Sequence, residues 1–158
     1  MDSIARSSRY APHLHSLMQA EPSQAYSDPI ACSALLSSRY YVGSRIEMVT
    51  ASGNTLRVWD LSKGECTREL SFHLDPVTCI AAAGQLVFSG GGKLLIGSDM
   101  VAGCQIPGAQ FRHAAFVTCV DARRLLLPDG RTVVAVVSGT DAIGKRVRLW
   151  MSTEIRGL

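Results

Sequence analysis

Three side chains of the types used by hydrolytic enzymes occur in the last third of the chain: His113, Ser138 and Asp141. A serine hydroxyl becomes a nucleophile when a histidine takes its proton and a carboxylate orients that histidine. Such a serine normally lies on a sharp strand-to-helix turn beside an oxyanion-hole loop, and no motif of that kind surrounds Ser138. The three residues therefore do not predict a hydrolase.

Two further patterns could bind a phosphate or a metal ion. Ser-Gly-Gly-Gly-Lys at 89–93 is similar to a phosphate loop, but it lacks the Walker spacing, and the Leu-Leu-Ile that follows favours a strand. None of the five cysteines lies two to four residues from another, as zinc ligands do. His13 and His15 have no evident third ligand. We expect no metal, no cofactor, no small-molecule substrate and no enzymatic activity.

The composition indicates a packed, all-β protein. The chain has 158 residues, of which 47% are hydrophobic and 18% charged, so a disordered chain is excluded. No apolar run approaches the roughly 18 residues of a membrane-spanning helix. Fourteen glycines and only 6% aromatic residues suit many tight turns between short strands.

The charge distribution argues against a nucleic-acid-binding face. The net charge is +3, and the basic excess lies in the final segment. No basic stripe with interleaved aromatic side chains is present, so we do not expect nucleic-acid binding. Arg123, Arg124 and the basic run at 145–148 keep an RNA-associated assembly subunit as an alternative.

The first twenty residues contain Arg6, Arg9 and several serines, a pattern that a mitochondrial presequence could share. Asp2 and the short apolar content argue against this interpretation. No secretory signal is present, so we read the cysteines as thiols in a reducing compartment. We expect an intracellular protein, cytoplasmic or nuclear.

An internal repeat organises most of the chain. The segment 73–80, ending Val-Thr-Cys-Ile, aligns without a gap with 113–120, which contains Phe-Val-Thr-Cys-Val, and an earlier copy occupies 26–33. Two further apolar runs follow each copy, and a fourth strand fits around 66–70 and 103–106. Four short antiparallel strands in about 40 residues form the unit of a β-propeller blade.

The third runs carry a family resemblance. Val58-Trp59-Asp60, and the segment 128–141 followed by Arg-Val-Arg-Leu-Trp150, resemble WD repeats over roughly residues 26–151. The resemblance implies β-propeller blades of four antiparallel strands. We predict an N-terminal extension at 1–25 and a propeller segment at 26–158. Three blades, at about 26–72, 73–112 and 113–158, would form a partial or open propeller, since closed ones have four to eight.

The resemblance also implies roles for particular residues. His113, Ser138, Asp141 and Trp150 match the family's hydrogen-bonded structural tetrad, in which carboxylate, imidazole, hydroxyl and indole satisfy one another. The other copies are degraded, with Tyr26 at the histidine position and Gly97 at the tryptophan position. The alignment divides the five cysteines into two groups and predicts that the members of each group occupy equivalent positions. The groups are Cys32, Cys79 and Cys119 on the first strands, and Cys66 and Cys104, each seven residues after Trp59 or Gly97.

The function that this resemblance implies is a non-catalytic scaffold for protein–protein interactions in a larger assembly. Loops before the first strand and after the second would share one rim, which carries Asp28, Asp75, Arg112 and Thr140. We expect protein partners, including a chain or domain that covers the open blade faces. The alternative to the scaffold, besides the RNA-associated subunit, is an incomplete propeller fragment without independent activity.

Overall fold

The computed structural model describes residues 28–36, 46–141 and 148–152, which form eleven strands. These strands make three separate antiparallel sheets, so the all-β prediction is confirmed. The described part of the chain has no helix long and apolar enough to cross a membrane. The predicted extension at 1–25 lies outside the described residues.

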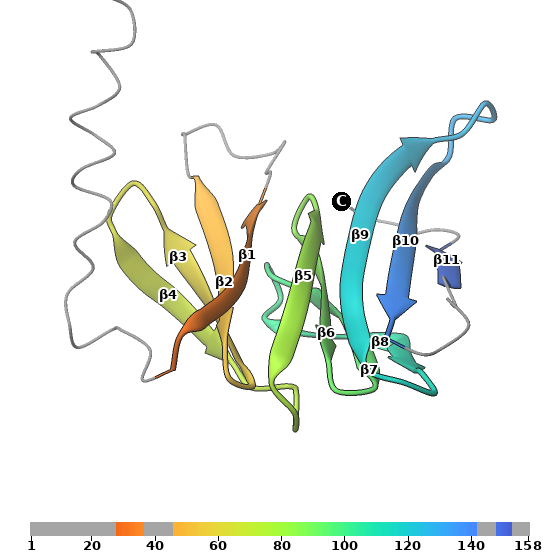
Figure 1. Ribbon diagram of the computed structural model, residues 1–158. Helices are drawn as coiled ribbons and strands as arrows, with labels where there is room; N and C mark the ends of the chain where they lie inside the picture. Colours follow the sequence, from red (N-terminus) through yellow and green to blue (C-terminus); the bar gives the residue numbers. More distant parts are fainter. Residues whose placement is uncertain (1–27, 37–45, 142–147, 153–158) are drawn as a thin grey trace, which may run out of the picture.

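The first sheet has the strand order β1-β2-β3-β4, as a simple meander gives (Figure 1). Its strands are β1 (Ile30–Leu36), β2 (Glu47–Ser52), β3 (Thr55–Asp60) and β4 (Glu65–Leu70). Buried and less buried residues alternate along β1 and in the first part of β3, as expected for strands with one face on a core.

The second sheet repeats this arrangement with the order β5-β6-β7-β8. Its strands are β5 (Val77–Ala83), β6 (Leu86–Gly91), β7 (Leu94–Asp99) and β8 (Cys104–Arg112). Every residue of β6 is buried, because this sheet lies between the other two and is covered on both faces. The turns on either side of β6 use Gly84 and Gly92, whose φ angles are positive.

The third sheet has the order β11-β10-β9, with β9 (Val117–Leu126), β10 (Thr132–Thr140) and β11 (Arg148–Ser152). Strand β9, with 10 residues, is longer than any strand of the other two sheets, and its hairpin with β10 extends past those sheets in Figure 1. Asp129 and Gly130 form the tip, as the Asp-Gly pair predicts, and Gly130 has a φ of 80°.

The first strands β1, β5 and β9 lie side by side, so the sheets fan out from a shared inner edge (Figure 1). Two apolar clusters fill the spaces between sheets. One joins Val49, Val58 and neighbours of the first sheet to Val77 and Val87 of the second. The other joins Phe88 and Leu95 of the second sheet to residues of the third, including Ala122, Val134 and Val136. This arrangement is consistent with part of a propeller.

The three sheets have a register shift at the same place in their first strands. This shift shows which residues of the three sheets are equivalent. The pairing shifts in each first strand just before a cysteine, so that Cys32 faces Ala51, Cys79 faces Gly90 and Cys119 faces Gly139. The predicted equivalence of these three cysteines is therefore confirmed.

The second cysteine pair is not equivalent, and that prediction is wrong. Cys66 pairs with Trp59, whereas Cys104 pairs with Asp99, one position further along the strand. The reason is that the turn from β3 to β4 and the turn from β7 to β8 place their cysteines at different distances from the last glycine, Gly64 or Gly103.

Candidate functional site

The residues that could have done acid–base chemistry form buried pairs. His113, in the loop before β9, is hydrogen-bonded through Nε2 to Ser138 Oγ at 3.2 Å. His113 is 4% exposed and Ser138 is fully buried, so no substrate can reach the hydroxyl. The backbone N–H of His113 donates to Lys93 O at 2.8 Å, which fixes the loop against the second sheet. The pair therefore holds strands together.

The other two predicted tetrad residues do not join this pair. The Trp150 ring stacks on Phe111 at a centroid distance of 4.1 Å and meets the His113 ring edge-on at 6.4 Å. Its buried Nε1 has no hydrogen-bond partner among the described residues. Asp141 is exposed, and its backbone N–H donates to Phe116 O at 3.1 Å. Among the described residues, the predicted four-residue network thus contains one hydrogen bond, and the indole stacks on Phe111.

Among the described residues, each of the other two sheets also shows a bond of this network. In the first sheet, Trp59 Nε1 donates to Thr50 Oγ1 at 2.8 Å. In the second, His73 Nε2 is hydrogen-bonded to Ser89 Oγ at 2.8 Å, while His73 Nδ1 has no hydrogen-bond partner in the described part of the chain. A carboxylate would be the natural partner for Nδ1, and glycines stand at 90–92 instead.

The register corrects one residue assignment in the second sheet. Trp59 pairs with Met48, two residues before Thr50. In the second sheet, Val87 lies two residues before Ser89 and pairs with Ser98. Ser98, and not Gly97, therefore occupies the position equivalent to Trp59. Asp99 then matches Asp60. A signal in the sequence could have revealed this, since a glycine follows each aspartate by four residues, at Gly64 and Gly103.

The two matched aspartates cap the turns that follow them. Asp60 is fully buried, and its Oδ1 accepts the backbone N–H of Ser62 at 3.0 Å. Asp99 Oδ1 accepts the N–H of Val101 at 2.8 Å and that of Ala102 at 3.1 Å. Side-chain acceptors of this kind fix turn geometry, so these carboxylates are structural.

The buried serines of the second sheet give opposite expected effects on stability. Ser98 Oγ is buried, and no described residue is its hydrogen-bond partner, so Ser98→Ala should raise the free energy of unfolding by up to about 1 kcal/mol. Ser89→Ala should lower it by about 1 to 3 kcal/mol, because it leaves the His73 imidazole without a partner. Urea unfolding of both variants measures this, and a Ser98→Ala variant less stable than wild type would contradict the assignment.

The two buried histidines make the fold sensitive to acid. Burial lowers the pKa of His73, although the negative charge of Asp75 and a hydrogen bond with the Ser89 backbone act in the opposite direction. Burial and the positive charge of Arg148 lower the pKa of His113. The unfolded chain, with histidine pKa values near 6.5, therefore binds more protons than the folded chain at lower pH.

The resulting stability is complete above about pH 6.5 and is lost as pH falls from there through the two lowered pKa values. The urea midpoint should therefore decrease between about pH 7 and pH 5. His113→Gln should show a smaller decrease. A midpoint that is constant or rises over this range would show that neither imidazole is held neutral.

The four residues predicted for a partner-binding rim lie at one edge of the sheets. Asp28 precedes β1, Asp75 precedes β5, Arg112 ends β8 and Thr140 ends β10, and the first three are exposed. Asp28 is anchored through its carbonyl, which accepts Ser52 Oγ at 2.7 Å. Their role in binding remains a prediction.

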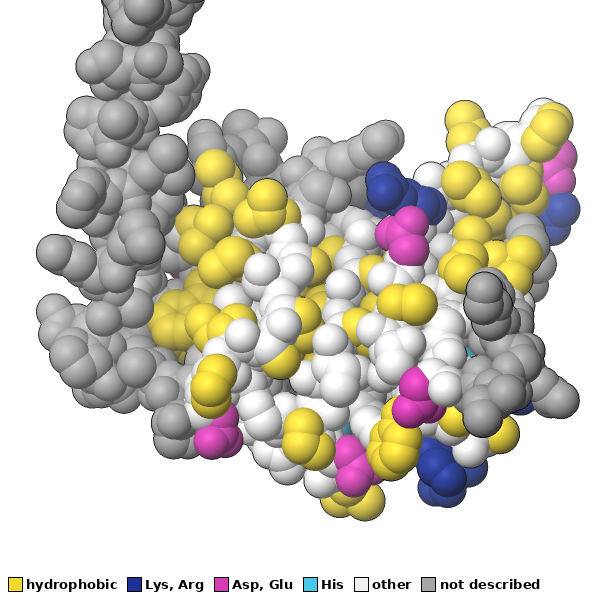
Figure 2. Space-filling model, viewed as in Figure 1, with side chains coloured by type: hydrophobic (Ala, Val, Ile, Leu, Met, Phe, Trp, Pro, Cys, Tyr) yellow, Lys and Arg dark blue, Asp and Glu magenta, His cyan; other side chains and the backbone are white. Residues whose placement is uncertain are grey.

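The rim also exposes two apolar residues that sequence reasoning missed. Leu74 is 96% exposed and Phe116 is 55% exposed, in equivalent loops before β5 and β9. Lys93 Nζ lies 6.0 Å from the centre of the Phe116 ring. Apolar side chains alternate with charged ones along the lower edge of the molecule in Figure 2. A leucine or phenylalanine next to a strand reads as core in the sequence, so only the structure reveals these two.

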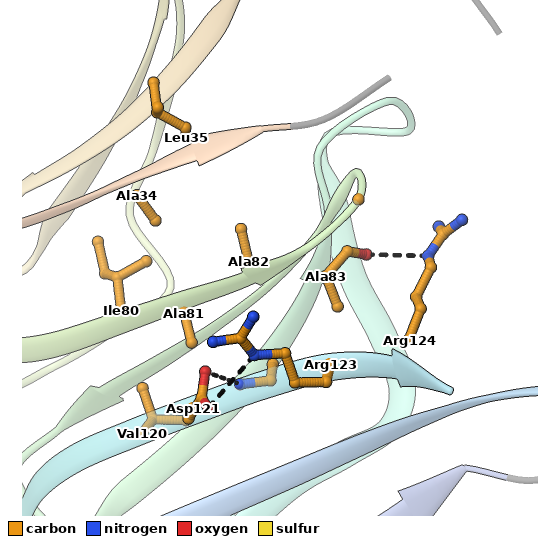
Figure 3. Close-up of a pocket in the computed structure, with 12 residues that line it drawn as sticks. Ala34, Leu35, Ile80, Ala81, Ala82, Ala83, Val120, Asp121, Arg123 and Arg124 are labelled. Atoms are coloured by element: carbon orange, nitrogen blue, oxygen red, sulfur yellow. Dashed lines mark hydrogen bonds and ion pairs between the residues drawn. The ribbon is translucent and has the colours of Figure 1, made fainter. Parts of the chain in front are cut away.

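A shallow hollow of about 410 Å³ lies along the inner strands β1, β5 and β9. Its lining is mostly small and apolar, with Ala82 and Ala83 in the centre (Figure 3). Asp121 and Arg123 form an exposed ion pair at 3.5 Å, and Arg124 Nε donates to Ala83 O at 3.1 Å. The hollow therefore offers no arrangement of acid, base and nucleophile.

The sheets and their shared register define a class: an all-β protein built from repeated antiparallel sheets, two of four strands and one of three in the described part of the chain. Residues 64–102 match the family model "WD40: WD domain, G-beta repeat". The match begins at the turn into β4 and ends after β7, so it includes one strand of the first sheet and three of the second. Residues 64–102 are therefore similar to a WD40 repeat, and the three sheets are consistent with part of a WD propeller.

Comparison with curated proteins gave no match. Among the described residues, no three His, Cys, Asp or Glu side chains gather where they could hold a metal ion. The rim is therefore taken as the candidate functional surface.

Proposed function

We propose that this protein is a non-catalytic scaffold that binds other proteins through its rim, within a larger assembly. WD40 repeats generally mediate protein–protein interactions, and residues 64–102 form such a repeat. The observation that carries the proposal is the exposure of Leu74 and Phe116 among the charged residues Asp75, Arg112 and Lys93. Apolar anchors within a polar surround are typical of protein interfaces.

The polar groups of the buried network support a non-catalytic role. Ser89 and Ser138 are fully buried and each is bonded to a histidine whose pKa is lowered, so both are held in place and shielded. A nucleophile needs an open position beside it for the substrate. The rim, in contrast, is accessible and held by backbone bonds between the sheets, such as Val77 N–H to Gly53 O at 2.7 Å.

A quantitative affinity purification tests the rim. The double charge reversal Asp75→Lys, Arg112→Glu should remove the partner proteins that the wild-type chain recovers, and Phe116→Glu should do the same. The matched control is Lys63→Glu, Glu65→Lys, which reverses one acidic and one basic residue in the exposed turn at the opposite edge of the first sheet. Partner recovery that is unchanged by both rim variants would disprove this binding surface.

A further inference from the structure

The three sheets pack on one another through a contact that the chain makes twice. Val77 N–H donates to Gly53 O at 2.7 Å, which ties β5 to the turn after β2. Val117 N–H donates to Gly92 O at 2.8 Å and ties β9 to the turn after β6 in the same way. Val77 is 1% exposed and Val117 is fully buried. Each first strand thus inserts a valine against the sheet before it.

The first sheet presents the same position without a covering sheet. Ile30 pairs with Ser52 as Val77 pairs with Gly91 and Val117 pairs with Thr140. Ile30 is nevertheless 58% exposed. Leu35, on the same strand, is 64% exposed, whereas its equivalent Ala122 in the third sheet is 3% exposed. We call the surface formed by Ile30 and Leu35 the leading face.

The third sheet presents the opposite half of the contact. Val49 and Val58 of the first sheet are 0% and 2% exposed, because the second sheet covers them. The register-equivalent residues of the third sheet are Val137 and Leu149, which are 37% and 61% exposed. We call the surface formed by Val137, Gly139 and Leu149 the trailing face.

Gly139, in the trailing face, differs from its equivalent in the second sheet, Gly90, in the residues that surround it. A Cβ placed on Gly90 would lie 2.6 Å from Val117 Cγ1, so this glycine makes room for the valine of the next sheet. Among the described residues, a Cβ placed on the equivalent Gly139 would meet only Cys119 Sγ within 4 Å. No described residue therefore fills the space that a side chain like Ile30 would occupy.

We propose that the trailing face of one copy binds the leading face of a second copy, head to tail. The two faces are the two halves of the contact that this chain already makes between its own sheets, so the second copy is the matching partner. Val133, on β10 of the same sheet, is only 2% exposed and is not available to a second copy. The surface that a second copy can contact is therefore centred on Leu149 and Val137 of the trailing face.

A head-to-tail contact can close into a ring. Two copies supply six sheets, within the range of four to eight blades found in closed propellers. The ring contains two contacts, so each needs to bury only about 400 Å² per copy to reach the roughly 800 Å² per partner of a stable complex. The two faces are formed by residues other than the proposed binding residues of the rim, so the contact between copies does not depend on the proposed function.

Light scattering coupled to size-exclusion chromatography tests the proposal with the full chain. The wild-type particle should have twice the 17.0 kDa mass of one chain. Ile30→Arg and Leu149→Glu should each give a folded monomer, since both side chains are exposed in the single chain. An equimolar mixture of the two variants should recover the two-copy particle, because it contains one unaltered contact and one Arg–Glu contact. Leu74→Glu, on the rim, is the control and should not change the mass.

Thiol labelling adds a readout of the trailing face. Cys119 faces Gly139 and is exposed, as is Cys104 in β8 of the second sheet. Mass spectrometry should find Cys119 protected from alkylation in the two-copy particle and reactive in Leu149→Glu, with Cys104 reactive in both. A wild-type monomer, or a dimer that Leu149→Glu leaves intact, would overturn the proposal, and the rim experiment would remain valid in either case.

Discussion

Replacing Leu95 with alanine is expected to lower the free energy of unfolding by about 3 kcal/mol, within the range of 2 to 5 kcal/mol for buried leucines. Leu95 is fully buried and belongs to the cluster between the second and third sheets. The substitution removes apolar contacts from both sheets and leaves a cavity that a sheet held on both faces cannot easily close. Urea unfolding followed by circular dichroism measures the effect.

The control is Leu126→Ala. This side chain is 76% exposed near the end of β9, so its truncation should change the free energy of unfolding by less than about 0.5 kcal/mol. Equal losses for the two variants would mean that the second and third sheets do not share a core.

Gly90→Val is expected to destabilise the protein by at least about 3 kcal/mol, at the upper end of overpacking effects. Even a Cβ at this position would lie 2.6 Å from both Cys79 Sγ and Val117 Cγ1, and valine adds two further methyl groups. The buried neighbours belong to two sheets, so relief requires the sheets to move apart. The shift in the urea midpoint reports the cost.

Gly139→Val is the matched variant on the third sheet. Gly139 occupies the same register position, but of the residues that the structure describes only the exposed Cys119 approaches it, through Sγ. In dilute protein we expect a cost below about 1 kcal/mol, because Cys119 can rotate away and valine favours strands. If Gly139→Val were as costly as Gly90→Val, the trailing face would not be open.

Much of the fold could be predicted because the repeat appears directly in the sequence. The Val-Thr-Cys segments before Ile80 and Val120 predict first strands, and the structure has β5 and β9 there with the same register shift. Alternation in the run ending at Trp59 predicts a half-buried third strand, which is β3. These signals are local, since each strand carries its own pattern.

The buried network was less predictable, because it depends on contacts between strands distant in the sequence. The Trp150 ring stacks on Phe111, which belongs to β8 of another sheet. The residues near Trp150 in the sequence do not predict this contact. The sequence alignment assigns the tryptophan position to Gly97, although Ser98 occupies it, because the glycines at 90–92 obscure the length of the turn. Only pairing across the sheet fixes such a one-residue shift.

The sequence predicts the charged residues of the rim but not its exposed apolar residues. Asp75 and Arg112 were recognisable as loop residues, whereas Leu74 has the same residue type as the buried Leu95. Exposure depends on where neighbouring loops and sheets lie. The same holds for Ile30 and Leu149, which occupy core positions of the repeat without a sheet to cover them.

The central claim is that three equivalent antiparallel sheets pack face to face in chain order. Nuclear Overhauser effects in solution test it most directly, through the Trp150 ring of the third sheet and the Phe111 ring of the second, whose centres lie 4.1 Å apart. The account predicts strong cross-peaks between these two rings, together with cross-strand peaks between Trp59 and Met48. Helical cross-peaks within β5 to β10, or a Trp150 ring without contacts to Phe111, would contradict it.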